Sequence, residues 1–167
     1  MPAAAAIRAS ALAFALLMPA APALATDFIL SLGYTDFSGL SPNDNAVLGL
    51  EVQSDPLRRF LGADWSAGAA IDLHEAGGYW LGAGPAAIWR RSDDWFIEAS
   101  VMPGYYEPGG SGNRLGSHFE IRSLIGVGRK LNEQLSVSVA FAHKSNAGTS
   151  SHNPGANSFL LRTRWHF

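Results

Sequence analysis

Residues 135–142 read LSVSVAFA, and a similar alternation returns in FLLRTRWHF at residues 159–167. In the first stretch large apolar side chains occupy every second position, with serine or alanine between them. Successive side chains of a strand point to opposite faces, so this period of two predicts a β-strand with one apolar face. In the second stretch Arg162, Arg164 and His166 occupy alternate positions, which indicates that the other face is polar.

The same period of two occurs through the rest of the chain. Together with 135–141 and 159–167, the alternating segments are 28–34, 46–52, 60–73, 79–89, 95–101 and 119–127. Pro85 lies inside one of them. Because proline lacks the backbone N–H of a sheet ladder, we expect a bulge or an irregular rung at that position.

The N-terminus has the pattern of a secretory signal peptide. Arg8 precedes the short apolar run ALAFALLM, and Ala23 and Ala25 form a small-residue cleavage site. The apolar run is about half of the ~20 residues that a membrane-spanning helix needs. We therefore expect residues 1–25 to be removed on export and residues 26–167 to form a single domain.

Composition excludes several classes of function. The chain has 167 residues, no cysteine and a formal net charge of −2. Without cysteine there is no disulfide framework, cysteine zinc site or thiol nucleophile. The charge gives no support for a nucleic-acid partner. We expect no metal or other cofactor.

The polar face of the predicted strands carries charges of both signs, at Glu51, Asp72, Glu98, Glu120, Arg122, Arg162 and Arg164. A transmembrane barrel turns such a face inward and its apolar face to lipid, whereas a soluble barrel does the reverse. Alternation alone fits both. The aromatic C-terminus, Phe167, and the alternation of long links (38–45, 103–117, 145–156) with short ones favour an eight-stranded antiparallel transmembrane up-and-down β-barrel in a bacterial outer membrane.

The last two strands and their loop hold a candidate catalytic site. His143 and Ser145 continue the lipid-facing parity of the strand 135–141, and Asn157 continues that of the strand 159–167. A histidine beside a serine is a base–nucleophile pair, and an asparagine can orient the imidazole. The Asn153 side chain and backbone N–H groups around Gly148 are candidate oxyanion donors. An incidental His-x-Ser and an ordinary Asn-Pro-Gly turn are the alternative interpretation.

The motif has a counterpart in a known family. The stretch His143-x-Ser145-Asn146-Ala147-Gly148, followed by Asn153-Pro154-Gly155-x-Asn157, resembles the lipid A 3-O-deacylase (PagL-like) family. The resemblance implies an outer-membrane β-barrel that hydrolyses the ester-linked acyl chain at the 3-position of lipid A, the anchor of lipopolysaccharide. Lipid A in the outer leaflet would then be the partner, and a homodimer is left open.

The resemblance also implies roles for individual residues. His143 would be the base, Ser145 the nucleophile, Asn153 and the Gly148 amide the oxyanion donors, and Asn146 the residue that orders the loop. One departure stands out, because the family has a glutamate where this chain has Asn157. An amide can orient the imidazole but cannot stabilise an imidazolium by charge.

Two other functions fit parts of the pattern. A non-enzymatic small outer-membrane barrel, for adhesion or surface stability, would leave the His-Ser motif without a role. A soluble lipocalin-like periplasmic binder would bury the apolar parity inside. In the deacylase interpretation, Arg114 and Lys144 are candidate contacts for lipid A phosphates.

Overall fold

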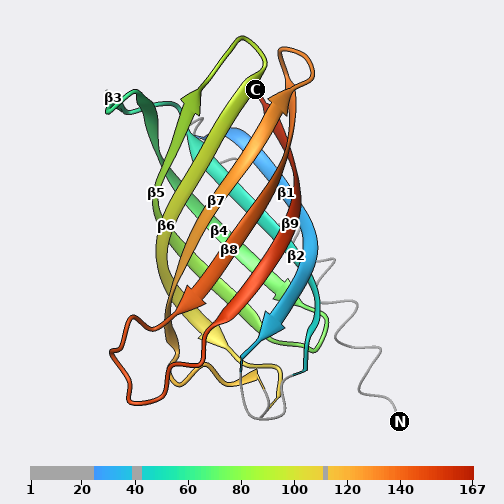
Figure 1. The fold of residues 1–167 in the computed structure, drawn as a ribbon, viewed down its shortest axis with the longest axis vertical. Coiled ribbons are helices and arrows are strands. Elements are labelled where there is room, and N and C mark those ends of the chain that lie inside the picture. Colours follow the sequence, from blue (N-terminus) through green and yellow to red (C-terminus); the bar gives the residue numbers. More distant parts are fainter. Residues whose placement is uncertain (1–24, 39–42, 111–112) are drawn as a thin grey trace.

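The computed structural model describes residues 25–38, 43–110 and 113–167. The described chain is built from antiparallel strands (Figure 1): β1 (Ala25–Phe37), β2 (Asn45–Ser54), β3 (Arg58–Phe60), β4 (Ala63–His74), β5 (Tyr79–Arg90), β6 (Trp95–Glu107), β7 (Phe119–Lys130), β8 (Leu135–Ser145) and β9 (Ala156–His166). The predicted signal peptide lies outside the described residues, except that Ala25 begins β1. None of the described residues forms a helix long and apolar enough to cross a membrane.

Eight strands close into a barrel. Strands β4 to β9 pair with their neighbours in sequence, β1 pairs with both β2 and β9, and the β2–β4 pairing completes the ring. Each of the eight predicted segments corresponds to one of these strands, so the predicted fold class is confirmed. The additional strand, β3, was not predicted; it folds onto the start of β4 through a turn in which Leu61 and Gly62 have positive φ.

Strands β5 and β6 contain the expected irregularity. Their register is the same on both sides of Pro85, from Gly82↔Gly104 to Ala86↔Ser100, but the residues between these pairs are unpaired with the opposite strand. Proline cannot donate to the ladder, and Pro103 on β6 falls in the same gap. The irregular rung is therefore present without a bulge.

The outer wall of the barrel is apolar. The side chains that are more than half exposed along the strands include Leu32, Tyr34, Leu81, Ile125, Val139, Phe159 and Leu161. A soluble barrel would bury this set, so the wall is that of a transmembrane barrel with its apolar face to lipid. The soluble lipocalin-like alternative is thereby excluded.

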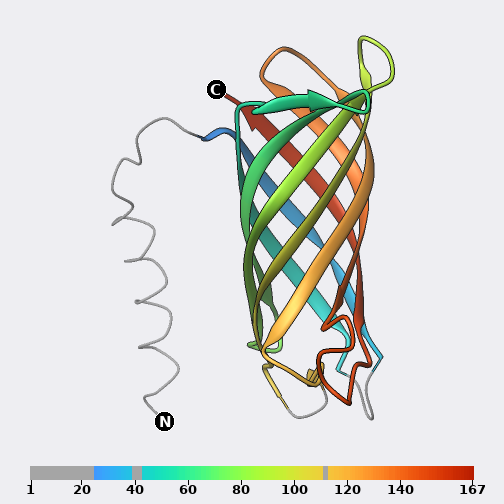
Figure 2. The same ribbon diagram turned by 90° about the vertical axis from the view of Figure 1, so that its left-hand side faces the viewer.

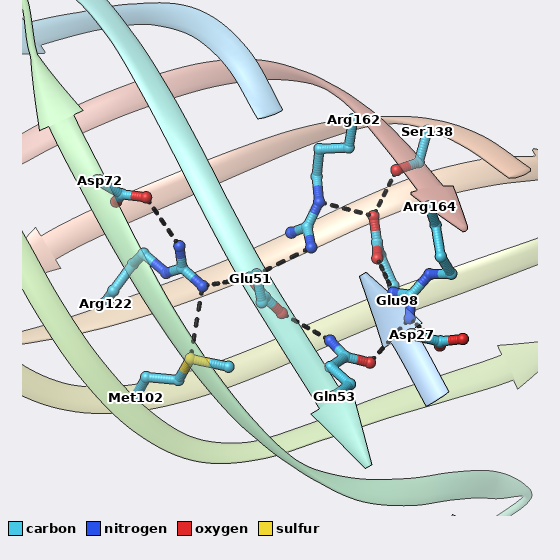
Figure 3. A network of polar contacts seen from close by, with 10 residues as sticks. All are labelled: Asp27, Glu51, Gln53, Asp72, Glu98, Met102, Arg122, Ser138, Arg162 and Arg164. Carbon is cyan, nitrogen blue, oxygen red and sulfur yellow. Dashed lines mark hydrogen bonds and ion pairs between the residues drawn. The ribbon is translucent and has the colours of Figure 1, made fainter. Parts of the chain in front are cut away.

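The predicted polar face lines the lumen and forms a connected network of charges (Figure 3). Arg122 bonds Glu51 at 2.6 Å and Asp72 at 3.1 Å, and Arg162 lies 3.3 Å from the same Glu51 carboxylate. Arg164 joins the network through Glu98 at 2.8 Å. The charges of this network therefore each have an opposite charge beside them, as burial away from water requires. The buried carboxylate of Glu120 is outside the network and has no hydrogen-bond or ion-pair partner among the described residues.

The two ends of the barrel differ (Figure 2). The links 75–78 and 146–155 lie at one end, called the loop end here, together with the described parts of the links 38–44 and 108–118. The links 91–94 and 131–134 lie with β3 at the other end, the turn end. Long loops of outer-membrane barrels face outward from the cell and short turns face the periplasm. The last two strands therefore bring the His-Ser motif to the external end.

Candidate active site

His143 and Ser145 lie on the outer wall of β8 at its loop end. Both side chains are half-buried, whereas their neighbours Ala142, Lys144 and Asn146 are buried on the inner side. This follows from the strand period of two, which continues from the exposed Phe141 without a bulge. The pair therefore faces lipid rather than the barrel axis.

Asn157 on β9 is the direct cross-strand partner of His143. The side-chain oxygen Oδ1 of Asn157 lies 2.8 Å from Nδ1 of the imidazole. An amide oxygen can only accept, so Nδ1 carries the hydrogen and Nε2 keeps its lone pair. The ring is thus held in the tautomer that can take a proton from a hydroxyl.

Two serines lie beside this imidazole. Ser145 is two residues along β8 on the same face, and Ser123 is the cross-strand neighbour of His143 on β7. Among the described residues, no hydrogen bond joins Ser145 to His143. Catalytic hydrogen bonds of this kind are often long before substrate binds and shorten in the complex.

Gly155 leaves room for the imidazole on the loop side, a role that the sequence motif did not assign. It is buried, its φ is +76°, and a Cβ placed on it would lie 3.0 Å from Cε1 of His143. Only glycine fits this position, because it accepts the left-handed backbone and leaves room for the ring. The Asn-Pro-Gly sequence predicted a turn here but not the contact with His143.

Asn146 organises the loop between β8 and β9. Its side chain is fully buried, and its Nδ2 donates to the carbonyl oxygens of Leu115 at 3.1 Å and His152 at 2.8 Å. Its Oδ1 accepts from the N–H of Gly148 at 3.0 Å. The single amide thus joins the loop 146–155 to the loop 108–118.

The two candidate oxyanion donors are placed differently by this loop. Asn153 is exposed, and its Oδ1 accepts from the backbone N–H of Asn146 at 3.1 Å, which leaves its amide hydrogens for another acceptor. The N–H of Gly148 is already bonded to Asn146, so an oxyanion would have to share it. Of the two, the Asn153 amide is the less committed donor.

An exposed apolar strip runs from the site toward the middle of the barrel. Phe141 and Phe159 occupy the next outward positions on β8 and β9, with ring centroids 5.3 Å apart. Val139 and Leu161 continue the strip and are both well exposed. This surface can take a hydrocarbon chain that lies along the barrel wall.

The two cations proposed for phosphates have different surroundings. Lys144 is buried in the lumen, where its Nζ pairs with Asp72 at 2.7 Å, so the expectation that it contacts phosphate is wrong. Arg114 lies in the loop 108–118 and lines a cavity of about 340 Å³ with His118 and His152. Within the described ranges, no cluster of three or more metal-ligating side chains is present.

Comparison with known proteins identifies the family and supports the fold. Residues 45–166 match the family described as lipid A 3-O-deacylase (PagL). The crystal structure of the outer membrane enzyme PagL superposes with a TM-score of 0.71 at 24% identity, over 84% of this chain and 99% of that one. Two further solved structures share the fold. A de novo designed transmembrane β-barrel superposes with a TM-score of 0.58 at 10% identity, over 90% of this chain and 100% of that one. Neisserial surface protein A (NspA) superposes with a TM-score of 0.53 at 10% identity, over 84% of this chain and 95% of that one. No curated protein matches the chain.

Proposed function

The chain belongs to the lipid A 3-O-deacylase (PagL) family, and we propose that it hydrolyses the 3-O-linked acyl ester of lipid A with Ser145 as nucleophile. Family membership and the barrel fold make it an outer-membrane enzyme that deacylates lipid A. The ester position and the serine mechanism are the proposed part. They rest on the residues of the site described above.

In the first step, Nε2 of His143 takes the proton of the Ser145 hydroxyl as its Oγ attacks the ester carbonyl carbon. The carbonyl π electrons move to oxygen and form a tetrahedral oxyanion. When this intermediate collapses, the bond to the sugar oxygen breaks and His143 returns the proton to that oxygen. A water molecule, activated by the same histidine, then releases the fatty acid and restores Ser145.

The oxyanion needs donors aimed at it. The amide hydrogens of Asn153, which have no partner among the described residues, would supply one donor, and the N–H of Gly148 would contribute a second, shared bond. Removing one such donor from a serine hydrolase costs about 10²–10³-fold in rate. Asn146 is bonded to both Asn153 and Gly148, so its role is to order the loop that carries these donors.

A site on the outer wall suits a substrate that is itself a membrane lipid. The ester bonds of lipid A lie at headgroup level in the outer leaflet, and the loop end of β8 and β9 lies at the same level. The acyl chain would then lie along Phe141, Phe159 and Leu161, which are already exposed to lipid. Lateral diffusion supplies the substrate, so no internal cavity is needed.

The observation that carries the proposal is the hydrogen bond from His143 to Asn157 on the lipid-facing wall, with Ser145 on the same face. The test is mass spectrometry of lipid A from cells that express the wild-type protein, Ser145→Ala or Ser123→Ala. We expect the wild type and Ser123→Ala to remove the 3-linked acyl chain and Ser145→Ala to leave it in place.

The barrel of each variant is checked by its heat-modifiable migration in gels. Unchanged deacylation by Ser145→Ala would assign the nucleophile elsewhere, and Ser123 would be the next candidate. A wild-type protein that is folded in the outer membrane and leaves lipid A unaltered would favour the non-enzymatic barrel.

A further inference from the structure

Building on the proposed function, we propose that Asp36 on β1 is a positioning residue that supplies, through Asn157, the negative charge that this site otherwise lacks. The family resemblance places a glutamate at position 157, and the amide found there is neutral. The carboxylate needed to stabilise a protonated His143 would then come from the next strand.

Barrel closure brings Asp36 to the site. Asp36 is the direct cross-strand partner of Asn157 in the β1–β9 pairing, and Asn157 is the partner of His143 in the β9–β8 pairing. Directly opposite side chains on one face have Cβ atoms about 4.5–5.5 Å apart. Asp36, Asn157 and His143 therefore form one transverse row across three strands, about 10 Å from end to end.

Asp36 is on the correct side of the wall. It is exposed, and the flanking Thr35 and Phe37 are both buried in the lumen. Across the described ranges, Asp36 takes part in no ion pair or side-chain hydrogen bond. Its carboxylate is therefore available to an adjacent donor.

Asn157 can transmit the charge. Its Oδ1 accepts from Nδ1–H of His143, so its Nδ2 hydrogens remain to be donated to the carboxylate of Asp36. No proton crosses this chain of bonds. The carboxylate orients the amide, the amide orients the ring, and the negative charge stabilises the imidazolium that forms when Ser145 gives up its proton.

The other acids are less well placed. Glu51, Asp72 and Glu98 are buried in the lumen and bonded to arginine or lysine. Asp44 accepts the backbone N–H of Phe37 at 2.9 Å from the link to β2, on the edge of β1 opposite to β9. Its carboxylate is therefore separated from Asn157 by the width of β1.

The described residues that surround His143 on β7, β8, β9 and the loop include no other outward-facing acid. On β7 the outward neighbours are Ile121 and Ser123, which are neutral, and Arg122 points inward to Glu51 and Asp72. On β8 itself Lys144 points inward to Asp72. On β9 the facing residue is Asn157, and the loop presents Gly155.

The test compares Asp36→Asn, which removes the charge and keeps the shape, with Asp36→Glu, which keeps the charge. Asp44→Asn is the matched control at the same end of β1, because an amide oxygen can still accept from Phe37. We expect Asp36→Asn to lower kcat by about tenfold with KM little changed, from two unit charges about 10 Å apart at an effective dielectric of about 20. Asp36→Glu should recover most of that loss.

A structural role alone would not change the pH profile. Without the carboxylate the imidazolium is less stable, so the acidic limb of kcat/KM in Asp36→Asn should move to lower pH. Direct titration of the His143 ring by NMR, in an inactive Ser145→Ala background, should move in the same direction and requires no turnover.

The double variant gives the sharpest outcome. In Asn157→Glu the acid is adjacent to the ring, so adding Asp36→Asn to this variant should lower kcat little or not at all. If Asp36→Asn has wild-type kinetics and an unshifted His143 titration while Ser145→Ala is inactive, Asp36 has no positioning role and the proposed function still stands. If the wild type does not deacylate lipid A, the proposed function itself fails.

Discussion

The imidazole of His143 donates through Nδ1 to the side-chain oxygen of Asn157 at 2.8 Å, and this bond joins the last two strands on the lipid side of the barrel. The base of the proposed reaction is therefore held by a neutral amide. A carboxylate at position 157 would both orient the imidazole and stabilise its charged form. The Asn157 amide supplies the orientation only. Substitutions at position 157 can distinguish them.

Replacing Asn157 by alanine removes the orienting bond, and replacing it by glutamate adds charge to orientation. We expect Asn157→Ala to lower kcat/KM by about fivefold, since one such bond is worth about 1 kcal/mol. We expect Asn157→Glu to raise it. The measurement is release of the 3-linked fatty acid from purified lipid A in detergent. Equal rates for Asn157→Ala and wild type would mean that the bond to Asn157 is not needed to orient the ring.

Gly155 lies so close to the imidazole that any side chain must displace it. We expect Gly155→Ala to reduce activity far more than Gly77→Ala, measured with the same lipid A assay. Both glycines have positive φ, so the backbone strain of about 1 kcal/mol or more is shared, but a Cβ on Gly77 meets nothing within 4 Å. Equal losses in the two variants would show that strain, rather than contact with His143, limits activity.

Asn146 joins two loops through its buried amide, so its loss should loosen them without opening the barrel. We expect Asn146→Ala to make the loop 146–155 sensitive to proteolysis and to abolish most deacylation. Hydrogen exchange should increase in the loops 108–118 and 146–155 and not in the strands. Asn132→Ala at the turn end, where the side chain accepts a single bond from Gln134, is the matched control. Unchanged exchange in both loops would contradict this role for Asn146.

Much of the architecture could be predicted because the alternation of apolar and polar side chains along each strand shows which side faces lipid. Alternation at residues 135–141 and 159–167 was sufficient to place His143, Ser145 and Asn157 outward. The extension of β6 to Glu107 was not predicted, since the sequence Pro103-Gly104 reads as the start of a loop. Pairing with β5 and β7 on both sides overrides that local signal.

The neighbourhood of Asn157 could not be predicted in the same way. Alternation gives the face of a residue but not its partner on another strand. The β1–β9 register depends on how the barrel closes, and the predicted first strand ended at residue 34, two residues before Asp36. The same limit applies to Gly155, whose contact with His143 depends on the path of the loop.

The charges of the lumen should matter for stability and little for catalysis. Glu51 is buried between Arg122 at 2.6 Å and Arg162 at 3.3 Å, so Glu51→Leu leaves two arginines short of a counter-charge. Breaking a buried pair in this way costs about 3–5 kcal/mol, whereas an exposed pair contributes about 0–1 kcal/mol. We therefore expect Glu51→Leu to lower the urea midpoint of the barrel in lipid vesicles strongly. Asp94→Ala, which breaks the exposed pair with Arg129, should change it little.

Because Glu51 faces away from His143, the Glu51→Leu molecules that do fold should deacylate lipid A at a near wild-type rate. A large loss of specific activity in folded protein would mean that the lumen network also positions β8 and β9 at the site.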